Sequence, residues 1–266
     1  MLKYEAYALT DIGNVRTNNE DNFFCNGIYK KDVSMPVYIF DEKGDAGNLS
    51  VFAVFDGMGG ADCGETASLT AAENLGKYFE EITAKERIFS GEEAILYMNA
   101  ALCIEMEKKQ ANMGSTAVVL SIQAGFAQVA NVGDSRAYLY RGSSLEQLSI
   151  DHTERGSLQR MRKELGLMQE EEDSIPEMKD VLTQHLGVLE EDFLLEPYIS
   201  GMSSLYAGDI YLLCSDGLSG MVSDKNIQEV LGSPCNIMQK AQQLREMALK
   251  AGGRDNITLL LLSCFG

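Results

Sequence analysis

VFAVFDGMGG, at residues 51–60, and IYLLCSDGLSG, at residues 210–220, share one pattern: an apolar run that ends at Asp-Gly. A short apolar run bounded by turn residues predicts a buried strand. An aspartate at the end of a core strand is held rigidly, and the glycine beside it lets the backbone approach a ligand closely. One Asp-Gly pair is more often a plain turn, but two at the ends of matched strands favour a shared site.

Outward from these two runs, strand and helix signals are unevenly distributed along the chain. Period-two alternation and turn residues predict further strands over Tyr4–Thr10, Thr116–Ile122, Phe126–Val132, Ser135–Tyr140, Leu145–Leu148 and Ile257–Cys264. Helical spacing of apolar residues predicts helices over Glu65–Ile82, Glu92–Asn112 and Ile237–Ala251. Residues 30–49 resemble a hairpin with a polar, Gly-rich tip. Because the strands come in runs, we expect an α+β fold of layered antiparallel sheets with helices outside.

The chain of 266 residues contains no Pro- or Ser-rich linker, so we expect one domain over residues 1–266. Residues 151–195 differ from the rest, since they begin basic, turn acidic and have a weak apolar pattern. Two readings stay open for this stretch: an inserted, mobile subdomain or a solvated helical excursion.

The chain is strongly acidic, with a net charge of −18. This charge repels nucleic acid and anionic membranes at long range, so we expect neither as a partner. A phosphate-handling enzyme of this charge needs local cations, either metal ions or a placed arginine. The six cysteines are scattered and form no CxxC pair, which is typical of a reduced, cytoplasmic protein. We expect no signal peptide, and the apolar run ITLLLL is too short to span a bilayer.

Two further acidic groups stand apart in the sequence: Asp255-Asn256, just before the closing strand, and Glu20-Asp21, with Arg16 upstream. The simplest readings are a turn cap and a surface ion pair. Taken together, however, carboxylates suit Mg²⁺ and Mn²⁺, whereas only two histidines are present and no HExxH motif favours zinc. Two such ions sharing a carboxylate lie about 3.5–4 Å apart and activate a water. Arg16 is suited to bidentate binding of a phosphate.

At this point the sequence resembles a known family, the metal-dependent Ser/Thr protein phosphatases of the protein phosphatase 2C type, and specifically its stand-alone bacterial members. The matching segments run in the family's order from near residue 10 to residue 262. They are DIGNVRTNNEDNFF, VFAVFDGMGGADCGETAS, MGSTAVV, VANVGDSRAYLYR, LSIDHT, VLTQHLG, YLLCSDGLSGMVSD and GGRDNITLLLL.

The resemblance implies a central antiparallel β-sandwich flanked by pairs of α-helices, in four layers, with a variable flap at residues 151–180. It implies a protein serine/threonine phosphatase that uses two Mn²⁺ or Mg²⁺ ions and opposes a bacterial Ser/Thr kinase. The implied roles are a bridging ligand (Asp56), a carbonyl ligand (Gly57), ligands of the other ion (Asp216 and Asp255), holders of metal-bound water (Asp21, Glu20 and Asn256) and a phosphate-binding residue (Arg16).

Three departures from the family pattern affect these implications. Met58 follows Asp-Gly where eukaryotic members carry a histidine proposed as a general acid. Asn112 stands where many bacterial members place an aspartate for a third metal ion, and an amide is a weaker Mn²⁺ ligand, so two ions are favoured over three. Gln184-His185 replaces a common Arg-Ala. His185 is then a candidate proton donor, although a lone histidine in a packed segment is more often structural.

The remaining motifs favour structural roles: Gly133-Asp134-Ser135-Arg136 predicts a tight turn, and His152 a structural or flap contact. The alternative function is a catalytically weak pseudophosphatase that binds phosphoproteins, although the core aspartates and Arg16 are all present. We expect a monomer whose partners are phosphorylated proteins and a cognate kinase.

Overall fold

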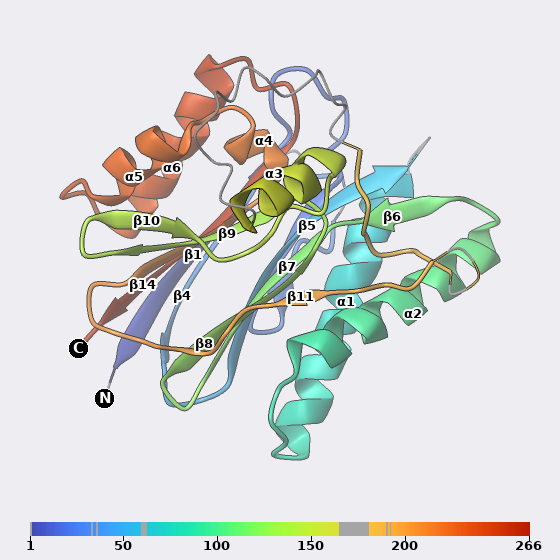
Figure 1. The fold of residues 1–266 in the computed structure, drawn as a ribbon, viewed down its shortest axis with the longest axis horizontal. Helices are drawn as coiled ribbons and strands as arrows, with labels where there is room; N and C mark the ends of the chain where they lie inside the picture. The colour runs from blue at the N-terminus through green and yellow to red at the C-terminus, as the bar shows by residue number, and fades with distance from the viewer. Residues whose placement is uncertain are drawn as a thin grey trace.

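The structure is a computed structural model of the chain, and it describes residues 2–32, 34–35, 37–59, 63–164, 181–189, 191 and 193–266. Within these residues two antiparallel sheets lie face to face, with helices on both outer sides (Figure 1). Sheet A has the strand order β10 (Ser144–Gln147), β9 (Arg136–Arg141), β13 (Ile210–Cys214), β14 (Ile257–Phe265), β1 (Lys3–Asp11) and β4 (Val37–Asp45).

Sheet B forms the other half of the sandwich. Its strand order is β11 (Tyr198–Ile199), β8 (Phe126–Val132), β7 (Ala117–Gln123), β5 (Ser50–Gly59), β2 (Asp21–Cys25) and β3 (Ile28–Tyr29), while β12 (Ser203–Ser204) pairs with β8 and β6 (Met113–Ser115) with β5.

Helices cover the outer face of each sheet. The long pair α1 (Cys63–Ala84) and α2 (Gly91–Lys109) packs on sheet B, whereas α4 (Asp216–Ser219), α5 (Asp224–Leu231) and α6 (Ile237–Lys250) pack on sheet A. Three apolar cores separate the layers: one under α1 and α2, one between the sheets and one under α4–α6. The four-layer α+β architecture expected from the sequence is therefore confirmed.

The predicted helices over Glu65–Ile82, Glu92–Asn112 and Ile237–Ala251 correspond to α1, α2 and α6. The expected hairpin over residues 30–49 is wrong, because Val37–Asp45 is a single strand that pairs with β1 along its whole length. No helix in the described part of the chain combines the length and apolar character needed to cross a lipid bilayer.

The stretch predicted as a flap contains α3 (Glu154–Glu164), which lies outside the two sheets (Figure 1). Its two described ends are joined, since His152 and Glu154 exchange backbone hydrogen bonds with Thr183 and Val181. Residues 165–180, where the sequence turns acidic, lie outside the described residues.

Candidate metal centre

Two of the predicted aspartates lie side by side in sheet B. Asp21 begins β2 and Asp56 lies near the end of β5, and the two residues are directly opposite in the antiparallel register. Directly opposite residues on such strands have Cβ atoms about 4.5–5.5 Å apart. The strand pairing itself therefore brings these two carboxylates together.

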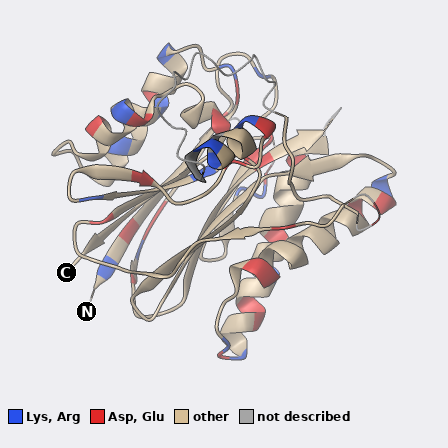
Figure 2. Ribbon diagram, in the orientation of Figure 1, with Lys and Arg blue, Asp and Glu red and all other residues tan. Residues whose placement is uncertain are grey.

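The other two aspartates come from sheet A at the same end of the sandwich. Asp216 directly follows β13 as the first residue of α4, and Asp255 precedes β14. Ser215 joins the sheets, because its hydroxyl donates to Asp21 Oδ2 at 2.7 Å and accepts from the Thr258 amide at 3.0 Å. Figure 2 shows acidic segments at this end, beneath α3 and α4 and far from the two termini.

The glycine after each strand-end aspartate is required by close backbone packing. A Cβ at Gly57 would overlap the carbonyl oxygen of Gly64, at the start of α1. A Cβ at Gly217 would overlap the carbonyl oxygen of Asn256, just before β14. The two glycines therefore allow the start of α1 and the residue before β14 to pack closely beside the aspartates. A plain turn would not require such close packing.

Burial and mutual repulsion raise the pKa values of the carboxyl groups at this end. Burial is the largest cause at Asp21, whose pKa rises to about 8 although Ser215 donates to it. The pKa of Asp56 is raised well above its ordinary range by burial and then by the charge of Asp21. The pKa of Asp216 is raised by burial and then by Asp255. Asp56 and Asp216 are half-buried as whole residues, and burial is the largest cause of the raised pKa at both carboxyl groups.

The chemistry of these groups fits divalent cations. The Asp216 Oδ1 atom is buried and has no hydrogen-bond partner among the described residues. A buried carboxylate oxygen without a partner is unfavourable unless a cation binds it. Among the described residues, no three acidic, histidine or cysteine side chains lie close enough together to hold a metal ion. The observation that points to a cation is therefore the unpartnered Asp216 Oδ1 atom.

Arg16 forms an ion pair with one of the predicted ligands. Its Nη2 atom donates to Asp255 Oδ2 at 2.6 Å, while 48% of its side chain stays exposed to solvent. The planar guanidinium has five N–H donors, so this bond leaves others for an incoming oxyanion. The pair holds the arginine at the edge of the aspartate cluster.

Asn256 fixes the loop that carries Arg16 and Glu20. Its amide donates to the carbonyls of Ile12 and Asn18 at 2.9 and 2.8 Å, and its Oδ1 accepts from the Glu20 amide at 2.7 Å. Both hydrogens and the oxygen of the side chain are therefore used on backbone of the 12–20 loop. This geometry gives Asn256 a positioning role, whereas its predicted contact with metal-bound water stays a prediction.

The sequence reasoning did not assign Asp134 to the site, because Gly133-Asp134 was read as a turn. In the structure, burial raises the pKa of Asp134 to about 7, and the charge of Asp216 is the next cause. The turn follows β8, and β9 pairs with β13 so that Arg136 lies opposite Cys214. Only this strand register could have revealed that Asp134 lies near Asp216.

Two hydroxyl residues behind Asp56 were also missed. Thr116 Oγ1 accepts from the Asp56 amide at 3.0 Å and shares a hydrogen bond of 2.7 Å with Ser135 Oγ. The Thr116 amide donates to the Asp56 carbonyl at 2.9 Å. These bonds attach the Asp56 backbone in β5 to Thr116, just before β7, and through Thr116 to the turn that carries Asp134.

Both histidines have structural contacts. Nδ1 of His185 bonds to the carbonyl of Leu186 at 2.8 Å, and its ring packs edge-on against Phe193. The buried His152 accepts from the Gly133 amide through Nδ1 at 3.2 Å, and burial lowers its pKa to about 4. Both contacts favour the structural readings.

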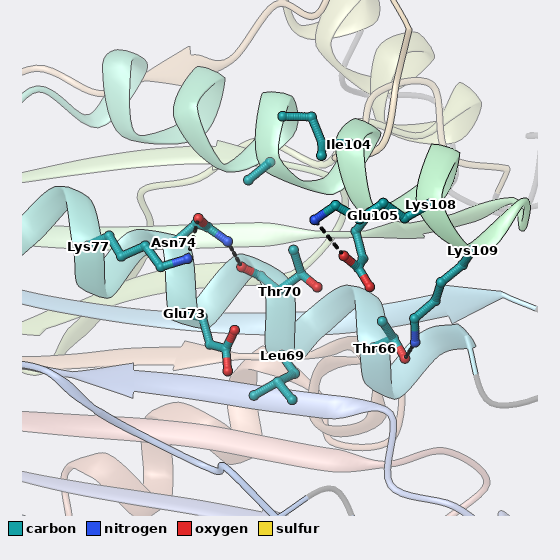
Figure 3. Close-up of a pocket in the computed structure, with 11 residues that line it drawn as sticks. Thr66, Leu69, Thr70, Glu73, Asn74, Lys77, Ile104, Glu105, Lys108 and Lys109 are labelled. Atoms are coloured by element: carbon teal, nitrogen blue, oxygen red, sulfur yellow. Dashed lines mark hydrogen bonds and ion pairs between the residues drawn. The ribbon is translucent and has the colours of Figure 1, made fainter.

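A groove of about 500 Å³ between α1 and α2 lies apart from the aspartates (Figure 3). Its polar side chains bond to one another: Lys109 to Thr66 at 3.0 Å, Lys108 to Glu105 and Lys77 to Asn74. It contributes no group to the aspartate cluster.

Known proteins resemble this chain over nearly its whole length. The sequence model described as Protein phosphatase 2C matches residues 5–257. The chain is 32% identical to the serine/threonine phosphatase stp of Listeria monocytogenes (serovar 1/2a) over 265 residues, which is 95% of this chain and 93% of that protein. It is 32% identical to protein phosphatase PhpP of Streptococcus pneumoniae (serotype 2) over 267 residues, covering 97% of each chain.

Among solved structures, the catalytic domain of the serine/threonine protein phosphatase PstP in complex with two manganese ions is similar over 100% of both chains. The TM-score is 0.75 and the identity is 28%. A family match over nearly the whole length, a shared fold and strand-end aspartates gathered at one end of the sandwich lead to one conclusion: the chain belongs to the protein phosphatase 2C family.

Proposed function

We propose that this chain hydrolyses phosphoserine and phosphothreonine in proteins at the aspartate cluster, with two Mn²⁺ or Mg²⁺ ions bound there. The enzyme class, a protein serine/threonine phosphatase, follows from family membership. The observation that carries the assignment of the site is the buried, unpartnered Asp216 Oδ1 among carboxyl groups with raised pKa values, within the described residues. Such a group is electrostatically incomplete without cations.

We propose that Asp56 binds both ions, the Gly57 carbonyl binds one, and Asp216 and Asp255 bind the other. Two bound divalent ions would lower the pKa of a shared water and neutralise charge on the phosphate. Asp21 is anchored by Ser215 and faces Asp56 in register, which suits it to orient water beside the ions.

Arg16 binds the substrate phosphate in this proposal. It is half exposed at the edge of the cluster, and Asp255 orients its guanidinium. A guanidinium held in one geometry loses less conformational freedom when it binds a phosphate bidentately. It also supplies local positive charge in a chain whose net charge is −18. Glu20 is held by Asn256 next to Asp21 and would orient metal-bound water with it.

We also propose that residues 1–266 form one phosphatase domain and that the protein acts in the cytoplasm as a monomer, opposing a Ser/Thr kinase. The substrates are phosphorylated proteins. No observation favours the pseudophosphatase alternative.

The test is hydrolysis of p-nitrophenyl phosphate and of phosphoserine and phosphothreonine peptides, with Mn²⁺ and with EDTA. We expect hydrolysis only with the metal, and calorimetric titration should show two Mn²⁺ sites. Full activity in EDTA would refute the metal-dependent mechanism. Three equally tight sites would mean that Asn112 does not limit the metal count.

A further inference from the structure

A lysine side chain is buried beneath the aspartate cluster. Lys30 follows β3 and is 1% exposed. Its backbone amide and carbonyl are both bonded to the side chain of Asn22, at 2.9 Å each, and its Nζ atom donates to the carbonyl of Asn19 at 2.7 Å. Lys30 therefore ties the end of β3 to the Asn22 side chain in β2 and to the backbone of Asn19. Asn19 lies two residues before Asp21.

A buried glutamate lies at the start of α1, the helix that packs against β2 and β3. Glu65 is in the first turn of α1 and is 8% exposed. Its Oε2 atom has no hydrogen-bond partner among the described residues. Gly64, just before it, packs against the Glu20 side chain and, through its carbonyl, against Gly57. The start of α1 thus touches both the loop and the strand end that form the cluster.

The two buried charges act on each other. Burial lowers the pKa of Lys30 to about 8, and the negative charges of Asp21 and then Glu65 oppose this shift. A buried ammonium and a buried carboxylate are each costly alone, and removal of one leaves the other uncompensated. Lys30 and Glu65 therefore belong to one buried electrostatic unit.

We propose that Lys30 and Glu65 are positioning residues, two buried side chains of opposite charge that hold the Asn19–Asp21 segment and the start of α1 in the geometry needed for metal binding. The inference rests on the proposed metal site but concerns residues outside it. Groups that orient metal ligands without touching the metal commonly change metal affinity by about 10–100-fold when substituted.

A second buried lysine offers a matched control. Lys240 in α6 is 5% exposed, its Nζ atom donates to the carbonyls of Leu231 and Ser233 at and just after the end of α5, and no aspartate is among the causes of its lowered pKa. Its replacement removes a buried ammonium and its hydrogen bonds, as at Lys30, but leaves the cluster untouched. It therefore measures what the loss of a buried lysine does to stability alone.

The experiment is calorimetric titration of Mn²⁺ into the full chain and into the variants Lys30→Met, Glu65→Gln, Lys30→Met/Glu65→Gln and Lys240→Met, with thermal unfolding in EDTA measured in parallel. We expect Lys30→Met and Glu65→Gln each to weaken Mn²⁺ binding by on the order of 10-fold. We expect the double variant to bind no more weakly than Lys30→Met, because it does not leave Glu65 without the charge of Lys30. Lys240→Met should lower the unfolding temperature and keep the wild-type affinity.

The outcomes distinguish a failure of the proposed metal-dependent function from a failure of the positioning role of Lys30 and Glu65. A wild-type chain that binds no Mn²⁺ overturns the proposed function. If the wild type binds Mn²⁺ and Lys30→Met binds it equally well or more tightly, Lys30 is a structural or merely repelling charge, and the pair has no positioning role. Should Lys30→Met fail to fold, Glu65→Gln carries the same test, and wild-type affinity in that variant overturns the inference.

Discussion

Replacement of Asp216 by asparagine is expected to change the stability of the protein in opposite directions with and without metal. The Asp216 Oδ1 atom is buried without a partner among the described residues, and burial and the charge of Asp255 raise the pKa of the group. Asparagine has the same shape and no charge. A buried polar group without a partner costs about 1–3 kcal/mol, more when charged. We therefore expect Asp216→Asn to stabilise the chain in EDTA by about 1 kcal/mol.

This energy converts into a measurable temperature shift. At about 2.1 cal/mol/K per residue, a chain of 266 residues has an unfolding entropy of roughly 0.56 kcal/mol/K. The variant should therefore unfold about 2 °C above the wild type in EDTA. With Mn²⁺ at 100 times its Kd, one bound ion stabilises the wild type by about 2.7 kcal/mol, or about 5 °C. The variant lacks a ligand and should gain much less, so the order of stability reverses.

Scanning calorimetry in EDTA and in Mn²⁺ measures both shifts, and hydrolysis of p-nitrophenyl phosphate confirms the loss of activity. Asp209→Asn is the matched control, because Asp209 is also buried but is paired with Arg141 at 2.7 Å, away from the cluster. This control should unfold at a lower temperature in both conditions and keep the full Mn²⁺ shift. A full Mn²⁺ shift in Asp216→Asn would show that Asp216 is not a ligand. A lower unfolding temperature in EDTA would refute the reasoning about its buried charge.

Three further predictions follow from the site. Arg16→Ala should raise KM for phosphopeptides by on the order of tenfold with little change in Mn²⁺ affinity, since charged hydrogen bonds contribute about 1.5–3 kcal/mol; steady-state kinetics with an unchanged KM would remove its role. Gly217→Ala should lose about 1–3 kcal/mol of stability, because its Cβ would overlap the Asn256 carbonyl; denaturant unfolding at the wild-type midpoint would contradict this. Burial raises the pKa of Asp21 to about 8, so folding favours its neutral form. In EDTA this contribution to stability is fully present below the ordinary pKa of about 3.9 and is lost as the pH rises through about 8; denaturation from about pH 5 to about pH 9 measures it, and no decline would count against it.

The local sequence pattern was sufficient to predict the long helices and most strands, because amphipathic spacing and turn residues can be recognised from the sequence alone. It failed at β2, whose residues are buried on both faces and so show no alternation. It failed at β4 for a different reason. The glycines within residues 30–49 suggest a hairpin tip, but the Tyr4 ring packs where a Cβ of Gly44 would lie, so this glycine marks a close contact within a strand.

The candidate site was partly predictable because some of its residues also have a local sequence signal. Asp56 and Asp216 can be identified from sequence because each ends an apolar run, and the structure places Asp21 opposite Asp56 and Asp255 near Asp216. Asp134 and Lys30 carry no such local signal: one follows a turn glycine and the other lies in a polar stretch. Their importance comes from strand register and burial, which depend on the complete tertiary fold.

The position of β14 in sheet A has a consequence for how the chain acquires its structure during synthesis. β14 lies between β13 and β1, so β1 and β4 join the rest of their sheet only through residues 257–265. While these residues are still inside the ribosome, β1 lacks its inner partner, and Asp255 and Asn256 are not yet in place at the cluster. We therefore expect the nascent chain to expose an unpaired edge until residues 257–265 have left the ribosome, a state in which a ribosome-associated chaperone would protect it from aggregation.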